Sequence, residues 1–410
     1  MPALSFPAYQ KFYSAISSLE RFEKERNFFD NISCLDNFFA EYRNITFTVQ
    51  AALKHTEYFS SYEENRNKYL SDHWFVEKRN ETTKQKPFPL VKKIDITTYF
   101  PDESITLCTQ SFTVENDIPM DSLNNDLKNL LKNTSQDEVF FSATFSFFEK
   151  DTTVDLWDKL FSGITSMQTF MDVMYHTVGE NCILCNQLRE KIQHSKLSTI
   201  PKDFWLINDY VYYPTQDIFA RAQRLVMVIC GNKVASKLPL RTLIGSNYFN
   251  YDETTFGTFV FMHALIRIAK PGADIMPAIL TVYNDDTYDM DVFHADIKTT
   301  IYRKITEVSQ LIKNRDIRQI CFMSLYSYIS NVQNVPKTSK KRIASSANDI
   351  LAFESIDQDL NEMEYVFEGK ALSNINYVIS VMKRGPKTKL ELGRVNMSPI
   401  IQAFKSKKGK

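Results

Sequence analysis

Residues 35–53, LDNFFAEYRNITFTVQAAL, carry the pattern that decides the fold of the N-terminal part of the chain. Mainly apolar side chains recur there every three or four residues, and this spacing places them on one face of an α-helix. The stripe consists of Leu35, Phe38, Phe39, Tyr42, Thr46, Val49 and Leu53. Ser33 is predicted to cap this helix and Asp36 to lie in its first turn, because both side chains suit the N–H groups exposed there.

Helical spacing continues on both sides of this stretch. A later helix is predicted from about Phe59, with Arg79 near its C-terminal end. Pro87 and Pro89 stop that helix, since a proline disfavours helical geometry in the residue before it. Residues 1–88 are therefore predicted to form a helical domain.

After the prolines the apolar pattern changes to a period of two, which is typical of β-strands. Ile94–Phe100 alternates up to a turn, Ile105–Val114 follows as a hairpin partner, and Val139–Phe147 is the clearest strand. Residues 89–150 are predicted to form a small antiparallel meander. Residues 151–240 return to helical spacing, with a further helix beginning near Thr215.

The C-terminal region, residues 241–410, alternates between the two periods. Phe256–Ala269 is predicted to be a buried helix or strand, and Ile297–Ile312 matches the helical template. Strands are predicted at Ile279–Tyr283, Ile317–Tyr328, Ile350–Ile356, Tyr365–Phe367 and Asn376–Met382. The predicted fold class is α+β, with an N-terminal helical bundle, a small antiparallel sheet, middle helices and a C-terminal domain with a mixed sheet and a basic tail.

Length, charge and cysteine content limit the classes of function that the chain can have. A chain of 410 residues is too long for one compact core, and its equal numbers of basic and acidic residues, 49 each, exclude a global field that attracts polyanions or membranes. Six scattered cysteines, no apolar leader and no long apolar run predict a cytoplasmic protein without a membrane partner. No cofactor-binding motif is present, and none is predicted.

Two short motifs carry a resemblance to a known superfamily. Arg79-Asn80 ends the segment FVEKRN at residues 75–80, and Arg43-Asn44 lies within FFAEYRNITF at residues 38–47. Together they resemble the helical HEPN superfamily of bacterial nucleic-acid toxins and defence proteins. In that superfamily an arginine, a polar residue and a histidine spaced as R-x4-6-H form an RNase site. The resemblance covers residues 30–90 and implies Arg79 and Asn80 as the catalytic pair, in a homodimer whose cleft gathers Arg79 from each subunit.

The histidine of that motif is missing, because residues 84–86 read KQK. A metal-independent RNase needs a base for the 2′-hydroxyl proton and a cation for the phosphate charge. Lys84 and Lys86 suit phosphate binding, but a lysine is protonated at neutral pH and is a poor base. The sequence therefore favours a site that binds RNA or a nucleotide over one that cleaves. His73 is a substitute base, although its neighbour Trp74 favours a packed position.

A structural interpretation stands beside the functional one. Arg79 can pair with Glu41 or Glu77 while Asn80 caps a helix, in which case the motif only locks helices together. Arg43 flanks the apolar stripe, so it either faces the same groove as Arg79 or is buried against a carboxylate, which is the preferred explanation. The competing function is then a structural or interaction protein without a catalytic site.

Two weaker candidate sites involve metals or redox chemistry. Aspartates at 285, 286, 289, 291 and 296, with His294, suggest a hard-metal site and hence a metal-dependent enzyme, but they also suit an exposed hairpin, and no metal is predicted. Cys182 and Cys185 form a lone CxxC pair without the two further ligands that structural zinc requires. Small core residues are the preferred explanation for these cysteines.

Basic clusters at the C-terminal end complete the candidates. Lys340, Lys341 and Arg342 lie in a predicted exposed loop, and lysines follow at 383–389 and in the tail. Such clusters can bind nucleic-acid phosphates, although solvated loops explain most of them. The sequence as a whole predicts an HEPN-like protein of defence or toxin–antitoxin type, with RNA or nucleotide as ligand and a cognate antitoxin or defence protein as partner.

Overall fold

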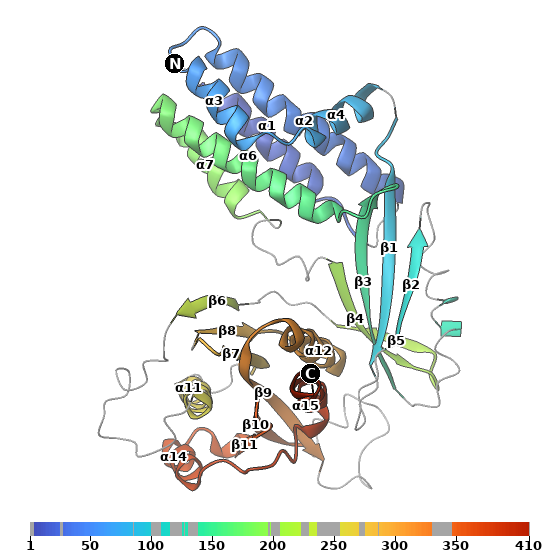
Figure 1. Ribbon diagram of the computed structural model, residues 1–410, viewed down its shortest axis with the longest axis vertical. Helices are drawn as coiled ribbons and strands as arrows, with labels where there is room; N and C mark the ends of the chain where they lie inside the picture. The colour runs from blue at the N-terminus through green and yellow to red at the C-terminus, as the bar shows by residue number, and fades with distance from the viewer. Residues whose placement is uncertain are drawn as a thin grey trace. The chain divides into compact units, whose positions relative to one another are not determined.

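The computed structural model is shown in Figure 1. The structure describes residues 4–24, 28–84, 86–99, 108–114, 125–126, 128–129, 138–195, 197, 206–222, 229–235, 255–269, 275–285, 287–329 and 347–409. The chain forms two compact units. Unit 1 comprises Met1–Thr97, Thr109–Gln136 and Ser142–Asn208, and unit 2 comprises Thr98–Cys108, Asp137–Phe141 and Asp209–Lys410.

Helices make up most of unit 1 (Figure 1). They are α1 (Phe6–Leu19), α2 (Phe28–Leu53), α3 (Phe59–Tyr69), α4 (Trp74–Lys84), α6 (Leu156–Val178) and α7 (Ile183–Gln193). Every residue of the stripe predicted within 35–53 is buried, which confirms that α2 is a core helix. The predicted cap was wrong, because α2 already begins at Phe28 and Ser33 lies inside it.

The segment that contains the RN motif is divided into two helices. α3 ends at Tyr69, and α4 begins at Trp74, whose backbone N–H donates to Asp72 Oδ1 at 3.0 Å. The aspartate side chain supplies the acceptor that a helix N-terminus lacks. The single helix predicted from Phe59 to Arg79 was therefore wrong, and Arg79 lies in the middle of a short helix.

A five-stranded sheet has the order β2-β1-β3-β4-β5. Its strands are β1 (Leu90–Tyr99), β2 (Cys108–Val114), β3 (Val139–Glu149), β4 (Ile207–Tyr213) and β5 (Ile218–Arg221). The first three strands were predicted. The helix predicted near Thr215 was wrong, because Ile218–Arg221 pairs antiparallel with β4. The turn between them places Asp217 at φ 53°, and Tyr212 Oη donates to Asp217 Oδ1 at 3.0 Å.

Unit 2 contains a six-stranded sheet of order β11-β10-β9-β7-β8-β6. The strands are β6 (Ile229–Ala235), β7 (Ala278–Tyr283), β8 (Thr287–Val292), β9 (Ile317–Ile329), β10 (Ala347–Asp357) and β11 (Glu362–Glu368). All five neighbouring pairs are antiparallel, so the predicted mixed sheet was wrong. The pairs β7–β8 and β10–β11 are joined by short connections, so these strands fold back directly without a crossover.

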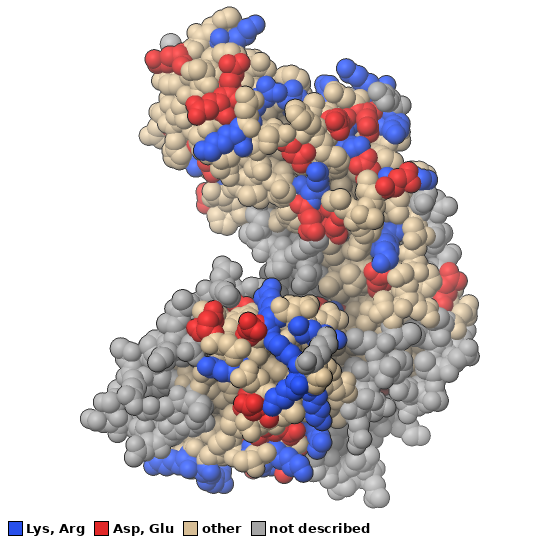
Figure 2. Space-filling model, viewed as in Figure 1, with Lys and Arg blue, Asp and Glu red and all other residues tan. Residues whose placement is uncertain are grey.

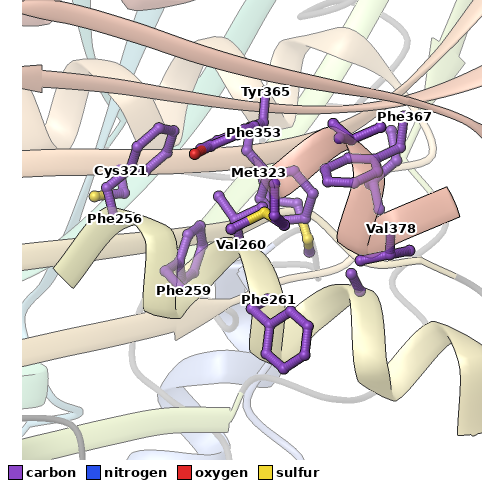
Figure 3. Packing of buried hydrophobic residues seen from close by; sticks show 14 of the residues in the cluster. Phe256, Phe259, Val260, Phe261, Cys321, Met323, Phe353, Tyr365, Phe367 and Val378 are labelled. Atoms are coloured by element: carbon purple, nitrogen blue, oxygen red, sulfur yellow. The ribbon is translucent and has the colours of Figure 1, made fainter. Parts of the chain in front are cut away.

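Two pairs of helices cover the two faces of this sheet. α11 (Thr255–Ala269) and α14 (Ile375–Arg384) pack on one face, where the core includes Phe259, Phe353 and Tyr365 (Figure 3). α12 (Lys298–Asn314) and α15 (Arg394–Lys408) pack on the other. Alternate residues of each strand supply the two cores, as the period of two requires. Unit 2 is thus a helix–sheet–helix sandwich.

The strand predicted at Asn376–Met382 was wrong, because these residues belong to α14. Asn374 caps this helix by accepting from the N–H of Asn376 at 2.9 Å. Val378, Val381 and Met382 are buried, and their spacing of three and one fits one helical face. A short apolar run fits either period, so the cap decides the outcome.

A buried ion pair fixes α12 within unit 2. Arg303 is nearly buried, and its Nε and Nη2 donate to Asp209 Oδ1 and Oδ2 at 2.9 and 3.1 Å. Thr300 Oγ1 donates to the same carboxylate at 2.9 Å. A bidentate arginine–carboxylate pair has strong directional geometry, so it sets the position of α12 against β4.

Two glutamates are buried on the α15 side of the sheet. Glu354 on β10 is opposite Glu364 on β11 in the antiparallel register, and their exposed fractions are 0% and 1%. Tyr326 Oη donates to Glu354 Oε1 at 2.9 Å, and Gly393 at the start of α15 leaves room for the Glu354 carboxyl group. Burial, together with the nearby Glu364 charge, raises the pKa of Glu354 to about 8.

The chain that follows α14 pairs with the outer edge of β11 at Glu364. Glu364 and Lys387 exchange backbone hydrogen bonds of 2.9 and 2.8 Å. Further along, Glu362 Oε2 accepts from Leu390 N–H at 3.1 Å, and Glu364 Oε1 accepts from Leu392 N–H at 2.9 Å. The two glutamates therefore hold this segment beside the strand.

Candidate functional site

A pocket of about 180 Å³ lies among the helices of unit 1. α2 contributes Arg43, α3 contributes Arg66, the α3–α4 connection contributes His73, and α6 contributes Ser162 and Ser166. The division of α3 from α4 creates this pocket, because the connection between them turns residues 70–73 toward α2 and α6.

Arg43 is half-buried and points to the pocket from α2. Its Nη1 donates to Thr46 Oγ1 at 2.6 Å, and its guanidinium carbon lies 4.2 Å from the centre of the Phe47 ring. Within the described chain Arg43 forms no ion pair, so the predicted carboxylate partner was wrong. Burial lowers the pKa of Arg43, and the positive charges of Arg66 and Arg79 lower it further.

Arg66 is the principal residue that sequence reasoning missed. It lies in the last turn of α3, lines the pocket, and takes part in no ion pair among the described residues. No motif marks it, and only its spacing of four residues from Tyr62, the one buried residue of α3, could have indicated that it faces inward. Arg43 and Arg66 thus bring two positive charges to one pocket, and neither forms an ion pair with a described carboxylate.

Arg79 and Asn80 lie on α4, next to the pocket rather than in it. Arg79 is half-buried, and its Nη1 donates to Asn80 Oδ1 at 3.2 Å. Arg79 is near enough to influence the pKa of Arg43. Asn80 is exposed in the middle of α4, so its predicted capping role was wrong. Glu41, one predicted partner of Arg79, lies 3.1 Å from Lys11 Nζ.

His73 is exposed at the pocket, so the packed position predicted from its neighbour Trp74 was wrong. The adjacent Asp72 also lines the pocket, and its Oδ2 lies 3.1 Å from Lys159 Nζ. The pocket therefore combines two guanidinium groups with one imidazole, which is the side chain suited to accept a proton near neutral pH.

The remaining predicted basic residues are not brought to this pocket. Lys84 and Lys86 are exposed at and beyond the end of α4. Lys340, Lys341 and Arg342 lie outside the described residues. In unit 2, Lys407 and Lys408 lie 3.7 and 3.1 Å from Asp316 and Asp359, and basic and acidic residues are interspersed on the visible face (Figure 2).

The aspartate-rich region has structural contacts. Asp285 accepts from Thr287 N–H at 3.0 Å, Tyr283 Oη donates to Asp289, and Asp291 lies 3.4 Å from Lys304 Nζ. Asp286 lies outside the described residues. In the part of the chain that the structure describes, no three His, Cys, Asp or Glu side chains are grouped to hold a metal ion. Nor does any helix among the described residues have the length and apolar character to cross a membrane.

Comparison with protein-family models, curated proteins and solved structures found no match to this chain. Two half-buried guanidinium groups that pair with no described carboxylate suit an anion with several oxygens, and a phosphate matches the arginine fork.

Proposed function

We propose that unit 1 is an HEPN-like domain whose pocket binds a phosphate group of RNA or of a nucleotide. The observation that supports this proposal is the grouping of Arg43 and Arg66, with Arg79 nearby, in a pocket where neither of the first two meets a carboxylate. Like charges repel each other in a partly desolvated site, and a bound phosphate relieves this repulsion. Two guanidinium groups in one pocket, with lowered solvent access and no ion pair among the described residues, therefore favour an anionic ligand.

The setting follows from the resemblance of the RN motifs. An HEPN-like domain implies a role in defence or in a toxin–antitoxin pair, a cognate partner protein and a homodimer in which Arg79 of both subunits faces one cleft. The competing proposal, a structural or interaction protein, differs in one respect: its arginines hold helices together and have no ligand. Light scattering of the purified chain tests the dimer separately from RNA binding.

The decisive experiment measures binding of a fluorescently labelled single-stranded RNA by anisotropy over a range of salt concentrations. Arg66→Ala is expected to weaken binding and to reduce the slope of log K against log salt by about 0.7, because one phosphate contact is lost. Lys68→Ala is the matched control, since Lys68 is exposed on the same helix and does not line the pocket. Equal effects of both substitutions contradict a specific pocket and favour the structural proposal.

A second candidate function is metal-free RNA cleavage, and the position of His73 favours it. An imidazole beside two guanidinium groups supplies both the base and the phosphate cation that such cleavage requires. Incubation of RNA with the protein in a chelator tests this. Cleavage that disappears in His73→Gln, while RNA binding persists, supports a nuclease; intact RNA leaves binding as the function.

A further inference from the structure

The two cysteines at residues 182 and 185 occupy positions that differ from the small core residues expected from the sequence. Cys182 is the N-cap of α7, with an extended backbone (φ −113°, ψ 117°), and its Sγ accepts from the backbone N–H of Cys185 at 3.4 Å. Cys182 is partly exposed, whereas Cys185, one turn into the helix, is fully buried. One sulfur is therefore accessible and the other lies directly behind it.

The surrounding contacts hold the cysteine turn in place. Tyr175 Oη accepts from Cys182 N–H at 3.1 Å and donates to Asn186 Oδ1 at 3.0 Å, so it joins the turn to α7. The preceding Glu180 accepts backbone hydrogen bonds from Ser5 at 3.2 and 3.1 Å. Ile183 is 74% exposed, which leaves the outer side of the turn open to solvent.

The electrostatic environments of the two sulfurs also differ. The backbone N–H of Cys185 lowers the pKa of the Cys182 thiol, as expected for a thiolate at a helix N-terminus. Burial raises the pKa of Cys185 to about 12. An accessible thiol with a lowered pKa next to a buried thiol with a raised pKa is the arrangement in which the first sulfur attacks and the second resolves.

We propose that Cys182 and Cys185 form a redox-active dithiol that exchanges with small dialkyl disulfides, of which oxidised glutathione is the probe. The Cys182 thiolate attacks one sulfur of the disulfide, which forms a mixed disulfide and releases one thiolate. Cys185 then loses its proton and attacks Cys182 Sγ, which closes the internal disulfide and releases the second thiolate. In total, two protein thiols are oxidised by two electrons, and one disulfide is reduced to two small thiols.

Disulfide formation requires a rotation at the start of α7. Side chains three residues apart on a helix have Cβ atoms about 5–6 Å apart, and a disulfide requires about 3.5–4.5 Å. Cys182 lies outside the helix proper, so rotation at the cap closes this gap without breaking α7. A zinc site does not compete, because no third metal-binding side chain joins the pair among the described residues.

The test equilibrates the full-length chain in buffers with increasing ratios of oxidised to reduced glutathione, followed by alkylation and mass spectrometry. Trypsin releases both cysteines in one peptide, residues 160–189. We expect this peptide to lose two hydrogens and its alkylation as the buffer becomes oxidising. Cys185→Ser should retain one glutathione on Cys182, and Cys182→Ser should leave Cys185 unmodified. Cys34→Ser, which removes a buried cysteine elsewhere in unit 1, should behave as the natural chain does.

Two results would overturn the proposal: both thiols surviving in the most oxidising buffer, or Cys185 being modified as readily as Cys182. The pH dependence of iodoacetamide alkylation of the unaltered protein gives a readout that needs no variant to fold. Its midpoint for Cys182 is expected below that of free cysteine, about 8.5. A midpoint at or above that value contradicts the proposed role of Cys182.

Discussion

Substitution of the buried Glu354 by glutamine is expected to change how the stability of unit 2 depends on pH. The folded protein holds the proton of Glu354 up to a pKa of about 8, whereas the unfolded chain releases it near the ordinary value of 4.5. The folded state therefore binds more protons between these two values. Its free energy of unfolding is greatest below pH 4.5 and falls as pH rises through 8.

The size of this effect follows from the two pKa values. Each unit of pKa difference corresponds to about 1.36 kcal/mol. The range from pH 5 to pH 8 covers most, but not all, of the interval between the two pKa values, so ionisation of Glu354 removes about 3.5 kcal/mol of stability over that range. Glutamine has nearly the same shape and does not ionise. It can still accept from Tyr326 Oη, so Glu354→Gln is expected to reduce the loss of stability over this range by that amount.

The assay must report on unit 2, and tryptophan fluorescence does not. The three tryptophans, Trp74, Trp157 and Trp205, all belong to unit 1. Urea unfolding followed by hydrogen–deuterium exchange of β10 peptides, at pH 5, 6.5 and 8, measures the relevant transition. Glu368→Gln, which alters an exposed carboxyl on β11, is the control. If Glu354→Gln and the natural protein lose stability in parallel, Glu354 is already ionised in the folded state, which contradicts this prediction.

Three further outcomes are expected. Asp209→Ala should destabilise unit 2 by about 3–5 kcal/mol, because it leaves the nearly buried Arg303 without its bidentate partner; a urea midpoint close to that of the natural protein would contradict this. Gly163→Ala should lower the free energy of unfolding of unit 1 by about 1–3 kcal/mol, because a Cβ there would lie 2.0 Å from the Phe75 ring. Thermal melting measures this loss, and Ser162→Ala, at the neighbouring exposed position, should be nearly neutral in the same assay. Arg43→Ala should weaken RNA binding while the melting temperature changes little, because Arg43 forms no ion pair in the described chain; equal losses of both would indicate a structural arginine.

Sequence periodicity predicted much of the fold where one face of an element is buried. The stripe of α2, the alternation in β1 and the apolar face of α12 all appear as expected, because burial on one face imposes a fixed period on each. Errors arose where a local cap or turn decides between two periods. Residues 376–382 were expected to form a strand, but the Asn374 cap starts α14 there. A helix was expected near Thr215, but the turn at Asp217 leads into β5.

The candidate site was less accessible to sequence reasoning. The RN motif drew attention to Arg79, but the pocket depends on a break between α3 and α4 that periodicity did not reveal. Arg66 and His73 meet Arg43 only through that break, and neither belongs to a motif. The pairing of Arg43 with a carboxylate was a reasonable expectation for a buried charge, but the side chain is only half-buried.

The covered edge of β11 has a consequence for association. An open edge strand offers unpaired N–H and C=O groups to any extended peptide, and this is how sheets grow between molecules. The segment around Lys387, tied down by Glu362 and Glu364, already takes that place. Another chain can pair with β11 at Glu364 only after displacing this segment, so this part of the sheet edge is protected against strand addition between molecules.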